Sequence, residues 1–130
     1  MEQVLIQEAS KLHREVEQLE NHCMLIDNEI GELEHFYKSI GEIENPEGKE
    51  ILASIGKGVF SPAKMTSGEF FIEVGAGMVI KKTPLEIRKV IEEQIEKMKT
   101  SKTLFNQQLE IKFVSLQEVI GRIEDLRKGR

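Results

Sequence analysis

An unbroken apolar pattern over the first forty residues limits the fold more than any other feature. One set of side chains lies seven residues apart: Leu5, Leu12, Leu19, Ile26, Leu33 and Ile40. A second set follows the first five by four residues: Ala9, Val16, Cys23, Ile30 and Tyr37. Alternating spacings of three and four, kept over about five heptads, are typical of a coiled-coil helix. So long and narrow a helix is not stable alone, so the pattern predicts a partner helix for residues 1–41. The run 41–48, which contains Pro46, ends the first helix.

A second long, charged stretch, residues 83–130, is the predicted partner. Thr83, Pro84 and Glu86 form a capping-box helix start. An apolar stripe follows: Ile91, Ile95, Met98, Phe105, Leu109, Phe113, Leu116, Ile120 and Ile123. Lys102 interrupts this stripe, and the spacings of four from Phe105 to Phe113 predict a stutter in the supercoil. Arms of matched length predict an antiparallel pair in which both chain ends meet at one tip.

The region between the arms, residues 49–82, repeats itself. Ile55-Gly56-Lys57-Gly58-Val59-Phe60 returns as Val74-Gly75-Ala76-Gly77-Met78-Val79. Glycine accepts the positive φ of tight turns, so each copy predicts a β-hairpin. The expected strands are 51–55 with 58–60 and 69–74 with 78–82, joined by a connector at 66–68. Pro62 lacks an N–H group, so its strand should lie at a sheet edge or end nearby.

Two isolated hairpins are marginally stable, and their unpaired edges invite another chain. The predicted fold class is therefore α+β: a long antiparallel two-helix coiled coil with tandem hairpins that assemble into a β-barrel between subunits. Phe70, Ile72 and Val74 are expected to share one face of their strand, with Phe71 beside the glutamates. The residues expected at the interface are Ile51, Ile55, Val59, Phe60, Phe70, Ile72, Val74, Met78 and Ile80.

Composition and charge exclude several classes of function. The net charge of −5 argues against nucleic acid as a partner. The single cysteine, Cys23, excludes an intrachain disulfide and favours a reducing compartment. The sequence contains neither a signal-peptide pattern nor a run of membrane-spanning length, so a cytoplasmic location without membrane contact is expected. The acidic flank of the first arm is expected to pair with lysines of the second: Lys97, Lys99, Lys102 and Lys112.

The sequence contains no recognisable motif for catalysis or for binding a cofactor. Both Gly-x-Gly pairs lack the third glycine and the following helix of a dinucleotide site. His13, His22 and His35 do not share a helical face at metal-ligand spacing. Cys23 lies at a seam position, where it acts as a small apolar residue. The sequence therefore predicts a protein that is not an enzyme, with no catalytic residue, no metal and no cofactor.

Taken together, these features resemble the prefoldin family, specifically its alpha-class subunit. The most specific residues are 56–60 with Pro62-Ala63-Lys64, and 74–77 leading to Lys81-Lys82-Thr83-Pro84. The duplicated Gly-x-Gly selects the alpha class, because the beta class has one hairpin. The resemblance covers the whole chain and implies one subunit, with a helix at 1–41, an oligomerisation region at 49–82 and a second helix at 83–130.

The resemblance also implies a function. Two alpha-class and four beta-class subunits would form a hexamer whose hairpins build a barrel platform. The coiled-coil tips would hold unfolded polypeptides, without ATP, and deliver them to a group II chaperonin. The alternative is a coiled-coil scaffold subunit that holds a fixed folded partner in another assembly.

Surplus apolar side chains at both arm ends are the candidates for client contact. A coiled-coil seam uses only one residue of an apolar run such as 4–6 or 119–120. The neighbouring apolar side chains are then available to contact hydrophobic client segments. These residues are Val4, Leu5, Ile6, Val119, Ile120, Ile123 and Leu126. The alternative is that they are seam residues and ordinary exposed aliphatic side chains.

Overall fold

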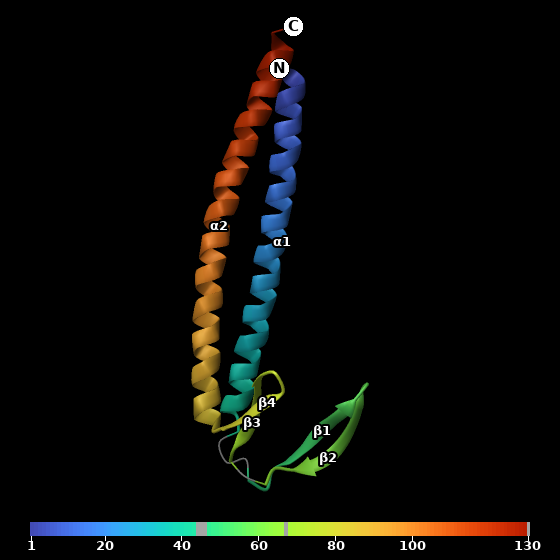
Figure 1. The fold of residues 1–130 in the computed structure, drawn as a ribbon, viewed down its shortest axis with the longest axis vertical. Coiled ribbons are helices and arrows are strands. Elements are labelled where there is room, and N and C mark those ends of the chain that lie inside the picture. Colours follow the sequence, from blue (N-terminus) through green and yellow to red (C-terminus); the bar gives the residue numbers. More distant parts are fainter. Residues whose placement is uncertain (44–46, 67, 130) are drawn as a thin grey trace. The chain divides into compact units, whose positions relative to one another are not determined.

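The computed structural model describes residues 1–43, 47–66 and 68–129. Within them the chain forms helix α1 (Glu2–Gly41), strands β1 (Glu50–Gly56), β2 (Val59–Lys64), β3 (Phe70–Gly75) and β4 (Met78–Lys82), and helix α2 (Pro84–Lys128) (Figure 1). The predicted fold class, two long helices with two hairpins between them, is confirmed. Residues 44–46 of the predicted helix stop and residue 67 of the predicted connector lie outside the described residues.

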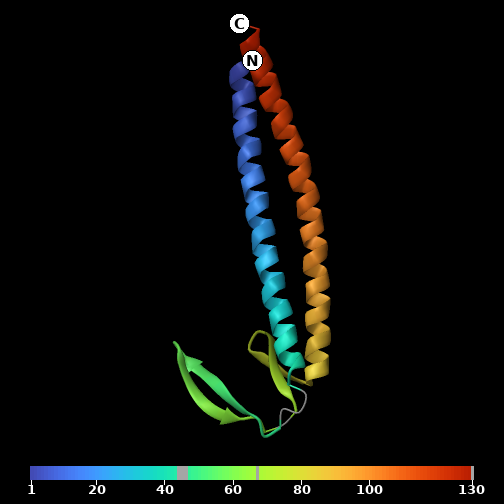
Figure 2. The same cartoon turned by 180° about the vertical axis from the view of Figure 1, so that it is seen from behind.

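The chain divides into two compact units. Unit 1 joins Met1–Glu32 to Glu96–Arg130, and unit 2 is Leu33–Ile95. In unit 1 the segments of α1 and α2 run antiparallel, and the two chain ends lie at the same end of the pair (Figure 1, and from behind in Figure 2). Ion pairs at matching levels fix this register, from Glu2 with Arg127 to Asp27 with Lys102. The predicted antiparallel arrangement is therefore present in this unit.

The seam predicted for α1 is confirmed at every position. Each of its eleven side chains is buried or half-buried, and the most buried are Leu5, Val16, Cys23, Ile30 and Ile40. The residues on either side of them are largely polar and exposed. A regular heptad pattern thus fixed the buried face of this helix, because apolar side chains at three-four spacing fall on one stripe.

The seam predicted for α2 is wrong at Phe113 and Ile120, and it is correct at Leu109, Leu116 and Ile123. Phe113 and Ile120 are exposed, whereas Lys112 is half-buried and Val119 is buried. The spacing of three and four therefore continues through Lys102 and Lys112, and the predicted stutter is absent from this segment. A lysine occupies a seam position when its aliphatic stem covers the partner helix and its ammonium reaches a carboxylate.

Both seam lysines meet such a carboxylate on α1. Lys102 Nζ lies 2.5 Å from Asp27 Oδ1, and Lys112 Nζ lies 2.9 Å from Glu15 Oε2. Two of the four predicted lysine pairings are therefore confirmed. In the described part of the chain, Lys97 and Lys99 form no ion pair with α1.

The repeated sequence forms two hairpins with the same turn. β1 pairs with β2 and β3 with β4, both antiparallel. The turn residues Lys57 and Gly58 have φ of 49° and 79°, and Ala76 and Gly77 have φ of 52° and 74°. Positive φ at both central positions is the signature of a type I′ turn, whose twist matches that of paired strands. The sequence repeat is therefore a structural repeat.

Two details of the hairpins differ from the prediction. β2 was expected at 58–60 but continues through Pro62 to Lys64, so of the two outcomes expected for this proline the edge strand is present and the early strand end is not. In the second hairpin the register shifts between Glu73 and Gly75, which makes Val74 the extra residue of a bulge. Val74 is consequently exposed, whereas Phe70 and Ile72 are half-buried. The predicted face shared by all three residues is thus limited to Phe70 and Ile72.

The capping box predicted at Thr83 is present. The backbone N–H of Thr83 donates to Glu86 Oε1 (3.1 Å), and the backbone N–H of Glu86 donates to Thr83 Oγ1 (3.2 Å). The hydrogen bond from the Thr83 backbone lowers the pKa of the Glu86 carboxyl. The two bonds satisfy donors that the first turn of α2 otherwise leaves without a partner.

Replacing Thr83 with alanine should loosen the start of α2. The lost cap is expected to cost about 0.5–2 kcal/mol of local stability, measured from hydrogen exchange of the first amides of α2. Thr83→Ser is the matched control, because its hydroxyl preserves the bond. Equal exchange rates in both variants would contradict the role of the cap.

Candidate functional site

The helix ends of unit 1 divide the predicted client-contact residues into two groups. Leu5 and Val119 are 7% and 4% exposed, which places them in the seam. Val4, Ile6, Ile120 and Leu126 are exposed, and Ile123 is half-buried. Leu5 and Val119 therefore pack between the helices and leave little surface for a client. The others leave apolar surface beside the chain ends.

Two shallow hollows lie in this end of unit 1. The larger, about 430 Å³, is lined by apolar side chains from both helices, including Ile6, Leu116 and Ile120, and has His13, Glu124 and Arg127 among its lining residues. The smaller, about 320 Å³, lies beside Met1, Leu5 and Leu126. A hollow lined by apolar side chains and bordered by charged ones can bind a short apolar peptide segment. Because the hollow is open, it should show little specificity for the peptide sequence.

Near the larger hollow, the ion pair between Glu15 and Lys112 links the two helices. Both side chains are partly covered, and Lys112 donates a hydrogen bond that lowers the pKa of the Glu15 carboxyl. A group whose pKa is lower in the folded state stabilises the fold above its ordinary pKa. That contribution is lost as the pH falls through the folded-state value. Acid should therefore weaken this part of the helix pair.

The effect of acid can be isolated with the variant Glu15→Gln, which cannot ionise. The wild-type protein is expected to melt at a higher temperature than the variant at neutral pH. The difference should shrink as the pH falls below the ordinary value of 4.5, because protonation then removes the same charge. Melting followed by circular dichroism across pH 3–7 measures this. A difference that is constant over the range would contradict the coupling.

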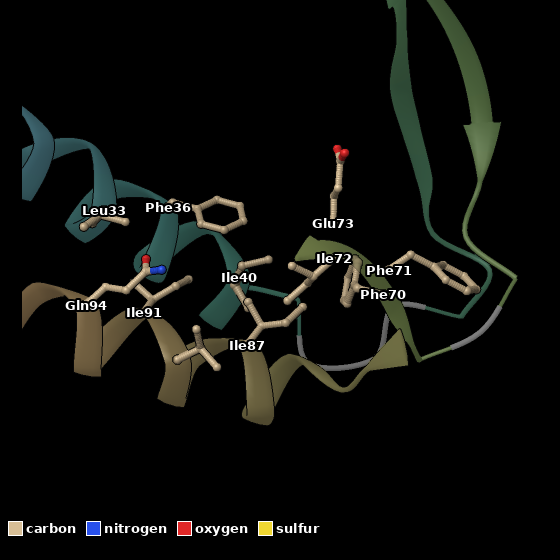
Figure 3. A pocket seen from close by; sticks show the side chains of 11 residues that line it. Leu33, Phe36, Ile40, Phe70, Phe71, Ile72, Glu73, Ile87, Ile91 and Gln94 are labelled. Atoms are coloured by element: carbon tan, nitrogen blue, oxygen red, sulfur yellow. The ribbon is translucent and has the colours of Figure 1, made fainter. Parts of the chain in front are cut away.

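In unit 2, a cavity of about 500 Å³ lies between β3 and the adjoining turns of α1 and α2. Figure 3 shows Phe70 and Ile72 on the side of β3 nearer to Ile40 and Ile87, whereas Phe71 points away from the helices. Two of the residues predicted to contact another subunit therefore line a cavity within their own chain. Their substitution would disturb this packing as well as any assembly.

Beside this cavity, the facing turns of the two helices are held by a polar contact. Tyr37 Oη donates a hydrogen bond to Glu92 Oε1 (2.5 Å), which raises the pKa of the Tyr37 phenol. The guanidinium of Arg88 lies over the Tyr37 ring, 4.3 Å from its centroid. A Cβ on Gly41 would come within 3.0 Å of that guanidinium, so the absence of a side chain there permits the approach.

The other predicted interface residues lie on the hairpins with their side chains exposed: Ile51, Ile55, Val59, Phe60, Val74, Met78 and Ile80. The prediction missed three further exposed apolar residues, Leu52, Phe71 and Val79. The sequence contained a signal for them, because successive side chains of a strand point to opposite faces of the sheet. A two-stranded hairpin has two open faces, and residues between the predicted ones belong to the second face. Both hairpins thus present apolar surface that their own chain leaves uncovered.

Other kinds of site are not formed by the described residues. Over the described ranges, no cluster of three His, Cys, Asp or Glu side chains is arranged to hold a metal ion. In the same ranges, neither helix is both long and apolar enough to cross a membrane. Cys23 is buried in the seam, where its Sγ lies 3.3 Å from Asn106 Oδ1.

The family model for prefoldin subunits matches residues 5–128. The chain belongs to the prefoldin family. Prefoldin is a chaperone family and not an enzyme family, so membership supports a chaperone-like function and assembly with other prefoldin subunits. The match spans both helices and both hairpins, the same elements whose geometry is described above.

Structure comparison agrees with this assignment at the level of the fold. A cryo-EM structure of filamentous PFD from Methanocaldococcus jannaschii is similar to this chain, with a TM-score of 0.73 and 20% sequence identity. The similarity covers 89% of this chain and 98% of the other. A search of curated proteins found no match. At this identity the similar structure establishes the fold of the prefoldin chain and no finer property.

Proposed function

We propose that this prefoldin chain is a subunit of an ATP-independent holdase that binds unfolded polypeptides at the helix ends of unit 1. The observation that carries the proposal is the exposed group Val4, Ile6, Ile120 and Leu126 beside two shallow apolar hollows. Unfolded chains expose apolar segments of many sequences. An open, weakly selective apolar surface suits that class of ligand better than a fixed pocket does.

The same proposal assigns the chain to the alpha class. Its support is the pair of hairpins with identical type I′ turns at Lys57-Gly58 and Ala76-Gly77. The expected partners are beta-class subunits, in a hexamer with two copies of this chain and four of the partner. Exposed apolar side chains on both hairpins support an assembly in which strands of several subunits close a β-barrel, which removes open edges.

Delivery of clients to a group II chaperonin in the cytoplasm completes the proposal. An assembly built from this chain alone is the other arrangement to test, since the similar PFD from Methanocaldococcus jannaschii is filamentous. The competing function is a scaffold that holds one folded partner. It is favoured by apolar side chains exposed along unit 1 away from the chain ends: Met24, Leu25, Leu104 and Ile111.

Removal of residues 1–6 and 119–130 tests the holdase function. The truncated chain should still assemble but should no longer suppress aggregation of a chemically denatured client, followed by light scattering. Native mass spectrometry of the same sample checks that the particle is intact. Full suppression by an intact truncated particle would contradict client binding at these ends. Saturable binding to one folded protein, with no binding to denatured ones, would support the scaffold.

A further inference from the structure

We infer that the larger hollow at the chain ends of unit 1 binds client segments in which an apolar residue and a lysine or arginine lie two positions apart. The inference rests on the proposed holdase function and specifies the class of client segment that this hollow accepts. Two of its lining residues support the inference: Ala9, whose side chain is small, and Glu124, whose carboxylate is unpaired in the described structure.

The larger hollow is a groove that runs along the helix pair. Its lining includes a row of residues from each helix, at spacings of four and three. The rows are Ile6, Ser10 and His13 on α1, and Ile120, Glu124 and Arg127 on α2. Residues at these spacings are neighbours on one face of a helix. Each row is about 10 Å long, which matches about three residues of an extended chain.

Ala9 gives the groove its depth. It is half-buried at a seam position of α1, and every other seam residue of this helix is larger. A methyl group leaves space where a longer side chain would pack against the facing helix. Leu116 and Ile123 of α2 line the same space, so it is apolar. This part of the groove can therefore accept an apolar side chain of a client.

An unpaired carboxylate borders the groove. The guanidinium of Arg127 is already used within the chain, since its Nε lies 2.9 Å from Glu2 Oε1. His13 Nε2 lies 3.0 Å from Glu17 Oε1. Among the residues that the structure describes, Glu124 has no ion-pair or hydrogen-bond partner for its carboxylate. Charge complementarity therefore favours a lysine or arginine of the client beside Glu124.

The distance between Glu124 and Ala9 determines the spacing of the client residues. Arg127 lies opposite Glu2 in the antiparallel pair, so Glu124, three residues earlier, lies at the level of Leu5. Leu5 precedes Ala9 by four residues, which is about 6 Å along the helix. In an extended chain, residues two positions apart point to the same side and lie about 6.6 Å apart. The groove therefore fits an apolar and a basic residue with a single residue between them.

Binding of labelled, unstructured peptides to the complex purified from its own cells tests the inference. The probe peptide contains copies of Leu-Ser-Lys separated by Gly-Ser linkers. One comparison peptide contains Leu-Ser-Glu instead, and the other contains Leu-Lys-Ser, which has the composition of the probe and a different spacing. Fluorescence anisotropy should show that the probe binds about two- to fivefold more tightly than either, because an exposed ion pair contributes modestly.

Variants of the chain in the assembled complex assign this preference to the groove. Glu124→Gln should remove it, whereas Glu118→Gln, which changes an exposed acid of α2 outside the groove lining, should not. Ala9→Leu fills the space beside Leu116 and should weaken binding of the probe several-fold. Gln7→Leu adds the same side chain to α1 outside the groove lining and should not weaken it. Seam positions accept leucine, so Ala9→Leu should remain helical, which circular dichroism checks.

The outcomes separate this inference from the proposed function. The inference alone would be overturned if a complex that still suppresses client aggregation bound the three peptides equally or not at all. A preference that survives in Glu124→Gln, or unchanged binding by a folded Ala9→Leu variant, would also overturn it. A wild-type complex that neither binds any of the peptides nor suppresses aggregation would overturn the proposed function as well.

Discussion

Replacing Leu116 with alanine is expected to lower the stability of the helix pair by about 2–5 kcal/mol, while Phe113→Ala costs less than about 1 kcal/mol. The two residues lie three positions apart on α2, and both were expected in the seam from the sequence. Leu116 is 8% exposed and Phe113 is 47% exposed. Truncation of a buried side chain leaves a cavity, whereas truncation of an exposed one removes few contacts.

Thermal and denaturant unfolding of the assembled protein, followed by circular dichroism, measures both changes. Comparing the two losses of stability also tests whether Lys112 occupies the seam. If the predicted stutter existed, Phe113 would occupy the buried seam position in place of Lys112. A larger loss for Phe113→Ala than for Leu116→Ala would contradict the heptad spacing in the structure.

Replacing Val4, Ile6, Ile120 and Leu126 together with serine is expected to abolish suppression of client aggregation. These four side chains supply much of the exposed apolar surface at the helix ends of unit 1. Each buried aliphatic side chain contributes about 1.5–3 kcal/mol to binding, so a weak, apolar contact should not survive the loss of four. The helices should remain folded, because none of the four is buried in the seam.

The matched control places the same number of serines elsewhere in unit 1, at Met24, Leu25, Leu104 and Ile111. These side chains are also exposed and apolar but lie away from the chain ends. Light scattering of a denatured client should show normal suppression by this control at equal concentration. Loss of activity in the control, with activity retained in the first variant, would favour the scaffold function and contradict client binding at the ends.

The sequence was sufficient for elements whose residue types directly impose a geometry. The heptads of α1 located its buried face without error, and Thr83 with Glu86 located the start of α2. Paired glycines predicted both hairpin turns, although Lys57 and Ala76 also adopt positive φ there. In each case a local pattern has a single low-energy outcome.

The sequence was insufficient where a side chain depends on its partner. Lys102 and Lys112 were expected to pair with acids of α1, but Lys102 was interpreted as an interruption of the seam and Lys112 was not placed in it. Both occupy seam positions because Asp27 and Glu15 on the facing helix accept their ammonium groups. The bulge that turns Val74 outward depends on the strand register, which no single residue specifies.

Native mass spectrometry of the tagged chain, purified from its own cells, tests the proposed function most directly. The expected result is a six-subunit particle with two copies of this chain and four of a smaller prefoldin partner, accompanied by chaperonin. A chain that is found alone, or bound to one folded partner in a fixed ratio, would contradict it.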